Sequence, residues 1–305
     1  MKNLLVTVLS VSLLILLYNC TSETKPEAKE ESMENMLEGS WRLIKTVEIG
    51  HEDSTGRQDS RTKMYQKHVT PTHFTWIEYD IENDQLNGTG GGTYTLQGNK
   101  YTEVIKFYYP PGSAEFGQAI PFQAELKDGK WYHTGYVNLM EFDPESGEHI
   151  VVDSAIIDEI WERNPEEPNK DLRLVGSWAL VKIKNEGDSV YTEYPDFVGY
   201  IKHITPTHFT WVQYNKDGDE VISEGGGTYT LEGDVYTETI EFIHPSGSNQ
   251  VGTVLPFDCK LVDGRWHHKG NLKRIKIDAG TGETVSIDST VIDEVWAPFE
   301  GPGAI

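Results

Sequence analysis

Hydrophobic and polar residues alternate with a period of two along most of the chain after residue 36. Runs rich in Val, Ile, Thr, Tyr, Phe and Trp are separated by turn signals such as Thr70-Pro71, the glycine run Gly90–Gly92 and Asp128-Gly129. This pattern is typical of β-strands with one buried face, and no amphipathic helix interrupts it. In the first half of this region the pattern predicts strands near 40–49, 63–69, 74–81, 92–97, 100–109, 118–128, 130–142 and 149–162.

The second half of the region repeats the same series of predicted strands. KHVTPTHFTWIEYD at 67–80 returns as KHITPTHFTWVQYN at 202–215, with ten of fourteen positions identical, and all eight tryptophans fall into four matching pairs. Eight successive antiparallel strands most naturally close into a barrel, because closure removes exposed sheet edges. We therefore expect an all-β protein with two tandem eight-stranded up-and-down barrels, at 37–163 and 174–298. A Pro-containing linker at 164–173 joins them, and a short tail follows at 299–305.

The N-terminal segment has a different character. An apolar run from Leu4 to Leu17 is too short to span a membrane comfortably and ends just before Cys20. This layout resembles a bacterial lipoprotein signal peptide at 1–19, although small residues are usual where Tyr18 and Asn19 stand. The resemblance implies lipidation of Cys20 and a place in the cell envelope, at the outer membrane or cell surface. The alternative is an ordinary secretory signal without lipid. The polar segment 20–36 has too few apolar residues to fold and is predicted to be a flexible tether.

Charge and cysteine content narrow the choice of partners. Acidic residues outnumber basic ones by 49 to 26, which argues against nucleic acid or anionic lipid as a partner. The membrane contact is therefore expected through the lipid anchor only. With Cys20 lipidated, Cys259 is the only remaining thiol. Because Cys259 aligns with Ala124 in the repeat, we expect a small buried side chain rather than a nucleophile.

Each copy resembles a lipocalin-like domain of the calycin type. Gly39-Ser40-Trp41 and Gly176-Ser177-Trp178 stand where a Gly-x-Trp signature opens the first strand of that barrel. The resemblance implies that a basic residue at the end of the last strand covers this tryptophan. Arg163 could do so in the first copy, whereas Ala297 and Pro298 occupy the matching place in the second.

Candidate site residues follow from strand parity, because alternate side chains of a barrel strand face the lumen. In the predicted strand 100–109, the face that carries Tyr101 and Glu103 is mostly apolar and should point inward. In strand 130–142 the same reasoning places Trp131 and His133 inside. The predicted ligand-binding set is His68, Tyr94, Tyr101, Glu103, Phe107, Trp131 and His133, and His203, Tyr229, Tyr236, Glu238, Phe242, Trp266 and His268. His68 and His203 belong to it on the expectation that Lys67 and Lys202 face outward.

Three interpretations of this set remain open. The Glu and His side chains could simply satisfy each other inside a filled barrel, as buried polar groups must, in a structural or assembly protein. They could orient a small hydrophobic or mixed-polarity ligand against aromatic walls. They could also perform chemistry, as a Glu–His acid–base pair of a hydrolase or isomerase, or as a two-His-one-carboxylate metal site. We predict the ligand-binding function, with no catalytic residue, metal or cofactor assigned.

Overall fold

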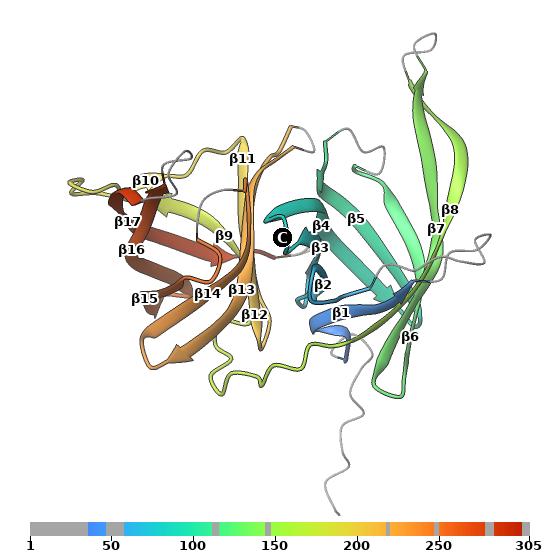
Figure 1. Ribbon diagram of the computed structural model, residues 1–305, viewed down its shortest axis with the longest axis horizontal. Helices are drawn as coiled ribbons and strands as arrows, with labels where there is room; N and C mark the ends of the chain where they lie inside the picture. The colour runs from blue at the N-terminus through green and yellow to red at the C-terminus, as the bar shows by residue number, and fades with distance from the viewer. Residues whose placement is uncertain are drawn as a thin grey trace, which may run out of the picture. The chain divides into compact units, whose positions relative to one another are not determined.

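Strands β1 to β8 close into the first barrel of the computed structural model (Figure 1). The structure describes residues 36–46, 58–111, 116–143, 148–217, 220–246, 250–277 and 284–300, without the side chains of 139–149 and 273–288. The predicted signal peptide, Cys20 and nearly all of the predicted tether lie outside the described residues. The strands are β1 (Gly39–Thr46), β2 (Lys63–Val69), β3 (His73–Asp80), β4 (Gln85–Gln97), β5 (Lys100–Tyr109), β6 (Ala119–Lys127), β7 (Lys130–Asp143) and β8 (Glu148–Arg163).

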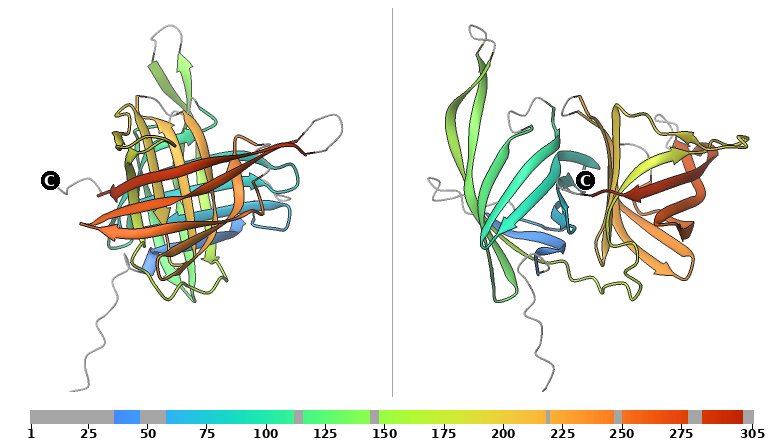
Figure 2. Two further views of the ribbon diagram at one scale, coloured as in Figure 1. Left: turned by 90° about the vertical axis from the view of Figure 1, so that its left-hand side faces the viewer. Right: turned by 180° about the vertical axis from the view of Figure 1, so that it is seen from behind.

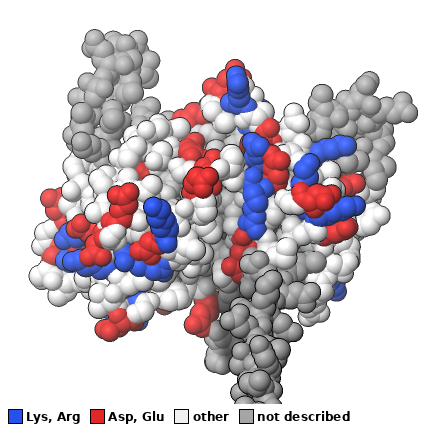
Figure 3. Space-filling model, turned by 90° about the horizontal axis from the view of Figure 1, so that it is seen from below, with Lys and Arg blue, Asp and Glu red and all other residues white. Residues whose placement is uncertain are grey.

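The second barrel repeats this order. Pairing of its last strand with its first closes the sheet, and the two-residue β10 adds to the edge of β9. Figure 2 shows both barrels from two further sides, and Figure 3 shows acidic and basic side chains interspersed on one face of the molecule. The strands are β9 (Gly176–Ile183), β10 (Thr192–Glu193), β11 (Val198–Ile204), β12 (His208–Asn215), β13 (Val221–Glu232), β14 (Val235–His244), β15 (Val254–Val262), β16 (Arg265–Ile277) and β17 (Thr284–Pro298). The prediction of two closed eight-stranded antiparallel barrels is confirmed. Among the described residues, no helix has the length and apolar character needed to cross a membrane.

The glycine run is part of a strand and does not break one. Gly90 and Gly91 lie inside β4, where a side chain on Gly90 would lie within 2.8 Å of Trp76 Nε1 and one on Gly91 would collide with Phe107. The β4–β5 ladder shifts register between Gly91 and Gly92, which pair with Phe107 and Ile105. A bulge of this kind reverses which face the following side chains occupy. The prediction that the strand begins at residue 92 is therefore wrong.

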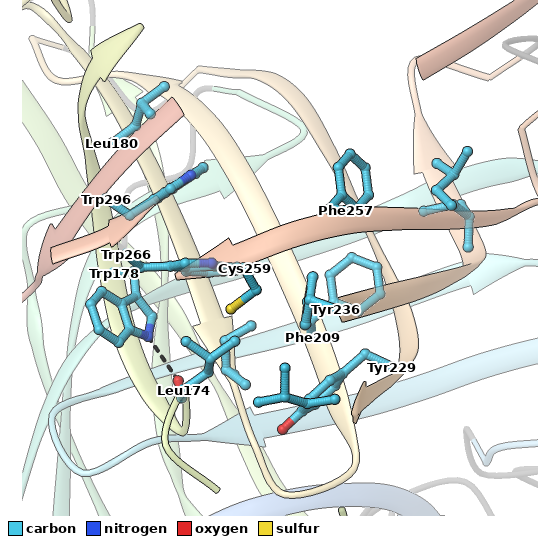
Figure 4. Packing of buried hydrophobic residues seen from close by; sticks show 14 of the residues in the cluster. Leu174, Trp178, Leu180, Phe209, Tyr229, Tyr236, Phe257, Cys259, Trp266 and Trp296 are labelled. Carbon is cyan, nitrogen blue, oxygen red and sulfur yellow. Dashed lines mark hydrogen bonds between the residues drawn. The ribbon is translucent and has the colours of Figure 1, made fainter. Parts of the chain in front are cut away.

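Both barrels bury a tryptophan of the Gly-Ser-Trp motif at one end of the core. Trp41 Nε1 donates to Leu37 O at 2.8 Å, and Trp178 Nε1 donates to Leu174 O at 2.7 Å (Figure 4). The Arg163 guanidinium lies 3.9 Å from the centre of the Trp41 ring, as the resemblance implies. Cys259 lies in the hydrophobic core of the second barrel, where it is fully buried and has a free thiol, as predicted.

The two barrels pack against each other through matching faces within the compact unit Ser32–Ile305. Three kinds of contact occur twice with the roles of the repeats exchanged, which defines an isologous interface around a pseudo-twofold axis. The repeated pairs are Ser40–Thr205 and Ser177–Thr70, both 2.7 Å between hydroxyl oxygens, His68–His208 and His203–His73, 5.4 and 5.6 Å between ring centres, and Phe107–Tyr214 and Phe242–Tyr79, 5.4 and 5.8 Å. The repeated stretches 67–80 and 202–215 therefore supply at least one partner of each of these contacts, and both partners of the histidine pairs.

Candidate functional site

A lysine ammonium lies inside each barrel, contrary to the prediction that these lysines face outward. Lys67 Nζ lies 2.6 Å from Glu103 Oε1, and Lys202 Nζ lies 2.7 Å from Glu238 Oε1. All four side chains are at most 5% exposed. The prediction failed because it assigned a lone charge to solvent, whereas a buried charge is tolerated when an opposite charge and hydrogen bonds compensate it.

Four aromatic rings surround each of these ammonium groups. Their ring centres lie 5.1–5.8 Å from Lys67 Nζ and 5.2–5.6 Å from Lys202 Nζ, close enough for cation–π attraction. The rings are Phe74, Tyr101, Trp131 and Trp161 in the first barrel, and Phe209, Tyr236, Trp266 and Trp296 in the second. The rings of this cage come from four strands of each barrel, β3, β5, β7 and β8 in the first and β12, β14, β16 and β17 in the second.

His68 and His203 face the partner barrel and not the lumen. Because successive side chains of a strand point to opposite faces, an inward Lys67 turns His68 outward. His68 Nδ1 lies 2.8 Å from Ser40 Oγ, and His203 Nδ1 lies 2.9 Å from Ser177 Oγ. Both rings are buried at the interface. Their inclusion in the predicted lumen set is wrong.

Phe107 and Phe242 do not face the lumen, so their inclusion in the predicted ligand-binding set is also wrong. The bulge opposite the glycine run reverses the parity of β5 and β14 at this point. Phe107 packs on the outer face of the second barrel with Tyr214, and Phe242 packs on the outer face of the first with Tyr79. In their place, Tyr108 lines the first lumen.

The inward position of Glu103 and His133 agrees with the parity prediction, but their partners differ from the predicted Glu–His pair. Glu103 pairs with Lys67, whereas His133 Nδ1 lies 3.1 Å from Glu159 Oε2, directly across the β7–β8 ladder. Trp161 Nε1 donates to the same carboxylate oxygen at 3.0 Å. The second barrel repeats this triad as His268, Glu294 and Trp296, with two distances of 3.1 Å. Glu159 and Glu294 share strand parity with Trp161 and Trp296 in the repeated Asp-Glu-x-Trp motif, a signal that could have identified them.

The charges of this triad follow from its surroundings. Burial and the Lys67 charge lower the pKa of His133, although Glu159 acts in the opposite direction. Burial alone would raise the pKa of Glu159, but hydrogen bonds from His133 and Trp161 and the charge of Lys67 outweigh it and lower that pKa. At neutral pH the imidazole is therefore neutral and the carboxylate ionised. Since a carboxylate only accepts, His133 Nδ1 carries the proton and Nε2 presents a lone pair.

Tyr94 and Tyr229 lie inside the barrels, where they are fixed by the turn before the third strand. Tyr94 Oη donates to Thr70 O at 2.9 Å, and Tyr229 Oη donates to Thr205 O at 2.9 Å. Tyr94 stacks obliquely on Tyr101, 5.1 Å between ring centres. These tyrosines therefore close the inner end of each lumen and brace the cage.

A cavity of about 310 Å³ opens above the cage of the first barrel. In the described part of the chain, its lining combines five aromatic residues, seven aliphatic residues and five Lys, Glu or His residues. The lining residues are Leu43, Tyr65, Lys67, Trp76, Ile77, Glu78, Glu103, Ile105, Tyr108, Ile120, Phe122, His133, Val137, Ala155, Ile157, Glu159 and Trp161. Sequence reasoning named Glu103 and His133 and missed Lys67, Glu159 and the outer aromatic residues.

The second barrel differs at the corresponding outer end. Gln213 stands where the first barrel has Glu78, and its Nε2 donates to Tyr194 Oη at 2.6 Å. Tyr194, from the segment after β10, packs on Tyr200 at 5.9 Å between ring centres, and Tyr200 packs on Trp296 at 5.2 Å. This aromatic stack occupies space above the second cage. The inner cages are alike, but the outer ends of the two lumens are not.

The described residues do not form a metal site. No group of three or more His, Cys, Asp or Glu side chains in this part of the chain is arranged to hold a metal ion. The two-His-one-carboxylate arrangement weighed from the sequence fails because His68 faces the interface, away from Glu103 and His133.

Comparison with known proteins leaves the family open. No protein-family model matches the sequence, and no curated protein gives a significant match. Among solved structures, an uncharacterized protein from Saccharomyces cerevisiae, YLR301w, is similar with a TM-score of 0.40 and 10% sequence identity. The match covers 86% of this chain and 98% of that chain. A likeness this distant does not bear on what either protein does.

Proposed function

We propose that the lumen of the first barrel binds a small organic molecule of mixed polarity. The observation that carries this proposal is His133 Nε2, a buried polar atom that makes no hydrogen bond within the described part of the chain. Buried polar atoms normally have a partner, and His133 lines the cavity of about 310 Å³. A bound molecule that donates a hydrogen bond would satisfy it.

The shape and lining of the cavity support the same proposal. Ligand pockets typically measure about 300–1,000 Å³ and combine apolar walls with a few polar groups, so this cavity suits a small ligand. Tyr65, Trp76 and Tyr108 supply aromatic walls, and the cage below supplies a rigid floor. Trp76 and Tyr108 meet edge to face at 5.6 Å between ring centres, which holds both walls in place.

The barrel type and the location belong to the same proposal. The stacking of Arg163 on Trp41 supports a lipocalin-like barrel. The sequence before Cys20 supports a lipid-anchored protein of the cell envelope, bound to the membrane through that anchor alone. Replacing Cys20 with Ser is expected to move the protein from the membrane to the soluble fraction. Wild-type protein already found in the soluble fraction, with another N-terminal residue, would contradict the anchor.

The decisive experiment is native mass spectrometry of protein purified from its own host. We expect one small molecule bound per chain, lost in His133→Gln and retained in His268→Gln, which makes the same change in the other barrel. Circular dichroism of both variants checks that they fold. The proposal fails if no molecule co-purifies and a broad fragment collection leaves the melting temperature of the wild type unchanged.

One observation favours acid–base chemistry as a second candidate function. Glu159 holds the His133 imidazole through Nδ1, which leaves a lone pair on Nε2, as in a general base, and His133 belongs to the cavity lining. Conversion of the co-purified molecule on incubation with the protein, abolished by His133→Gln, would favour this candidate. Release of the molecule unchanged would favour binding alone.

A further inference from the structure

We infer that the first lumen selects protonated organic amines with a compact aromatic or apolar body, and discriminates against carboxylic acids. This inference rests on the proposed binding function and names the class of ligand. It follows from which polar groups of the lining already have partners, and from the sign of the charge that remains.

The positive charge of the lining is already compensated. Lys67 contacts Glu103 at 2.6 Å, and four aromatic rings enclose its ammonium group. The pair is neutral as a whole, and its side chains are only 3% and 5% exposed. The ammonium group offers a ligand little accessible surface, and a ligand carboxylate beside it would bring a second negative charge close to the buried Glu103. Like charges at one buried site disfavour each other's ionised form.

The remaining inner polar groups are acceptors. Glu159 is ionised, and its hydrogen-bond partners among the described residues are the neutral N–H groups of His133 and Trp161, so its charge is stabilised but no ion pair cancels it. Its side chain keeps 13% of its surface exposed while lining the cavity. The same imidazole adds a lone pair on Nε2, which makes no hydrogen bond among the described residues. A ligand that fits these groups must donate hydrogen bonds, and positive charge improves the fit because an opposite charge stabilises the carboxylate.

The outer part of the cavity also favours ligands that donate hydrogen bonds and carry a positive charge. Glu78 lies on the lining and accepts a hydrogen bond from Tyr65 Oη at 3.2 Å. Among the described lining residues, Lys67 is the only permanent cation, against three carboxylates from Glu78, Glu103 and Glu159. Aromatic faces also attract cations, and Trp76 provides the strongest type of ring for this interaction. Carboxylates and aromatic walls together recognise an ammonium group.

Three probes of similar size and different charge test this inference by isothermal titration calorimetry at pH 7. They are 2-phenylethylamine, which is protonated, 2-phenylethanol, which is neutral, and 3-phenylpropionate, which is anionic. We expect the amine to bind at least tenfold more tightly than the alcohol, and the acid to show no binding. Glu159→Gln should weaken the amine at least tenfold, and Glu78→Gln, which copies Gln213, should weaken it several-fold. Glu294→Gln, the matched change in the second barrel, should leave the first site unchanged.

Equal affinity for the alcohol or the acid, or an unchanged affinity in a folded Glu159→Gln protein, would overturn the amine class. Failure of all three probes would overturn it as well. Neither result touches the proposed binding function, which is decided separately by the co-purified molecule and the fragment screen. If Glu159→Gln does not fold, Glu78→Gln, at a half-buried position on the outer lining, keeps the inference testable.

Discussion

Replacing Glu224 with Gln is expected to stabilise the protein at neutral and alkaline pH. Glu224 lies at the centre of the interface between the barrels, where its counterpart in the repeat is Thr89. The carboxyl group is fully buried, and Oε1 accepts a hydrogen bond from Thr89 Oγ1 at 3.1 Å. Oε2 has no partner among the described residues. Burial raises the pKa of Glu224 from 4.5 to about 8.

The sign of the effect follows from proton binding in the two states. Below pH 4.5 the carboxyl group is protonated in both the folded and the unfolded chain, so it carries no penalty. Between pH 4.5 and about 8 only the folded chain holds the proton, and the free energy of unfolding falls by about 1.4 kcal/mol per pH unit. The loss reaches about 3 kcal/mol at pH 7 and about 5 kcal/mol at pH 9. Glutamine does not titrate, so the variant avoids this loss. Its gain in free energy of unfolding is smaller by about 1–3 kcal/mol if the amide makes poorer hydrogen bonds than the carboxyl group.

Urea denaturation of the wild type and the variant at pH 5, 7 and 8.5, followed by tryptophan fluorescence, measures this difference. The gain in free energy of unfolding should grow by about 3–4 kcal/mol between pH 5 and pH 8.5. Glu232→Gln, at an exposed position of the same strand, serves as the control and should show no such growth. Parallel pH profiles for the wild type and Glu224→Gln would refute the reasoning, because they would mean that this carboxyl group is not buried in its neutral form.

Three further predictions concern the interface and the cages. Burial lowers the pKa of His73 and of His208 from 6.5 to about 4. Below pH 6.5 the unfolded chain therefore binds protons that the folded chain does not, and the free energy of unfolding should fall by about 2 kcal/mol for each histidine at pH 5. Asn at both positions should flatten the acid limb of a denaturation profile, and an unchanged limb would contradict this. Lys67→Met should cost about 3–5 kcal/mol by leaving Glu103 unpaired, and Glu103→Leu in the same chain should recover most of that loss in thermal denaturation. Residues 171–305 expressed alone should unfold cooperatively and form dimers in sedimentation experiments, and an unfolded fragment would show that the barrels depend on each other.

The fold and the inner part of the site could be predicted from the sequence, because alternation of apolar and polar residues with a period of two indicates barrel strands and their inward faces. Glu103 and His133 were placed correctly, since their strands have one clearly apolar face. Phe107 could not be placed, because a single bulge reverses parity and leaves no mark except the glycine run, which resembles a turn. Lys67 was misplaced because its partner lies on a strand that is distant in sequence.

The interface between the barrels could not be predicted from the sequence for a related reason. His68, Phe107 and Tyr79 occupy the outer faces of their strands, where the sequence pattern alone suggests solvent or lumen. Their burial depends on a second surface that only the packed repeats provide. The near-identity of the two repeated stretches was the available signal, because residues of one stretch contact residues of the other, as His68 contacts His208 and His203 contacts His73.

The linker 164–173 changes what the interface has to achieve. Two separate barrels would associate only above a concentration set by their affinity, whereas tethered barrels meet at a high effective concentration however dilute the protein is. A weakening group such as Glu224 can therefore persist at the centre of the contact. Fusion also allows counterpart residues to differ, so that Thr89 in the first barrel corresponds to Glu224 in the second, and Glu78 corresponds to Gln213. The duplicated chain is in this sense a dimer whose two subunits are free to specialise.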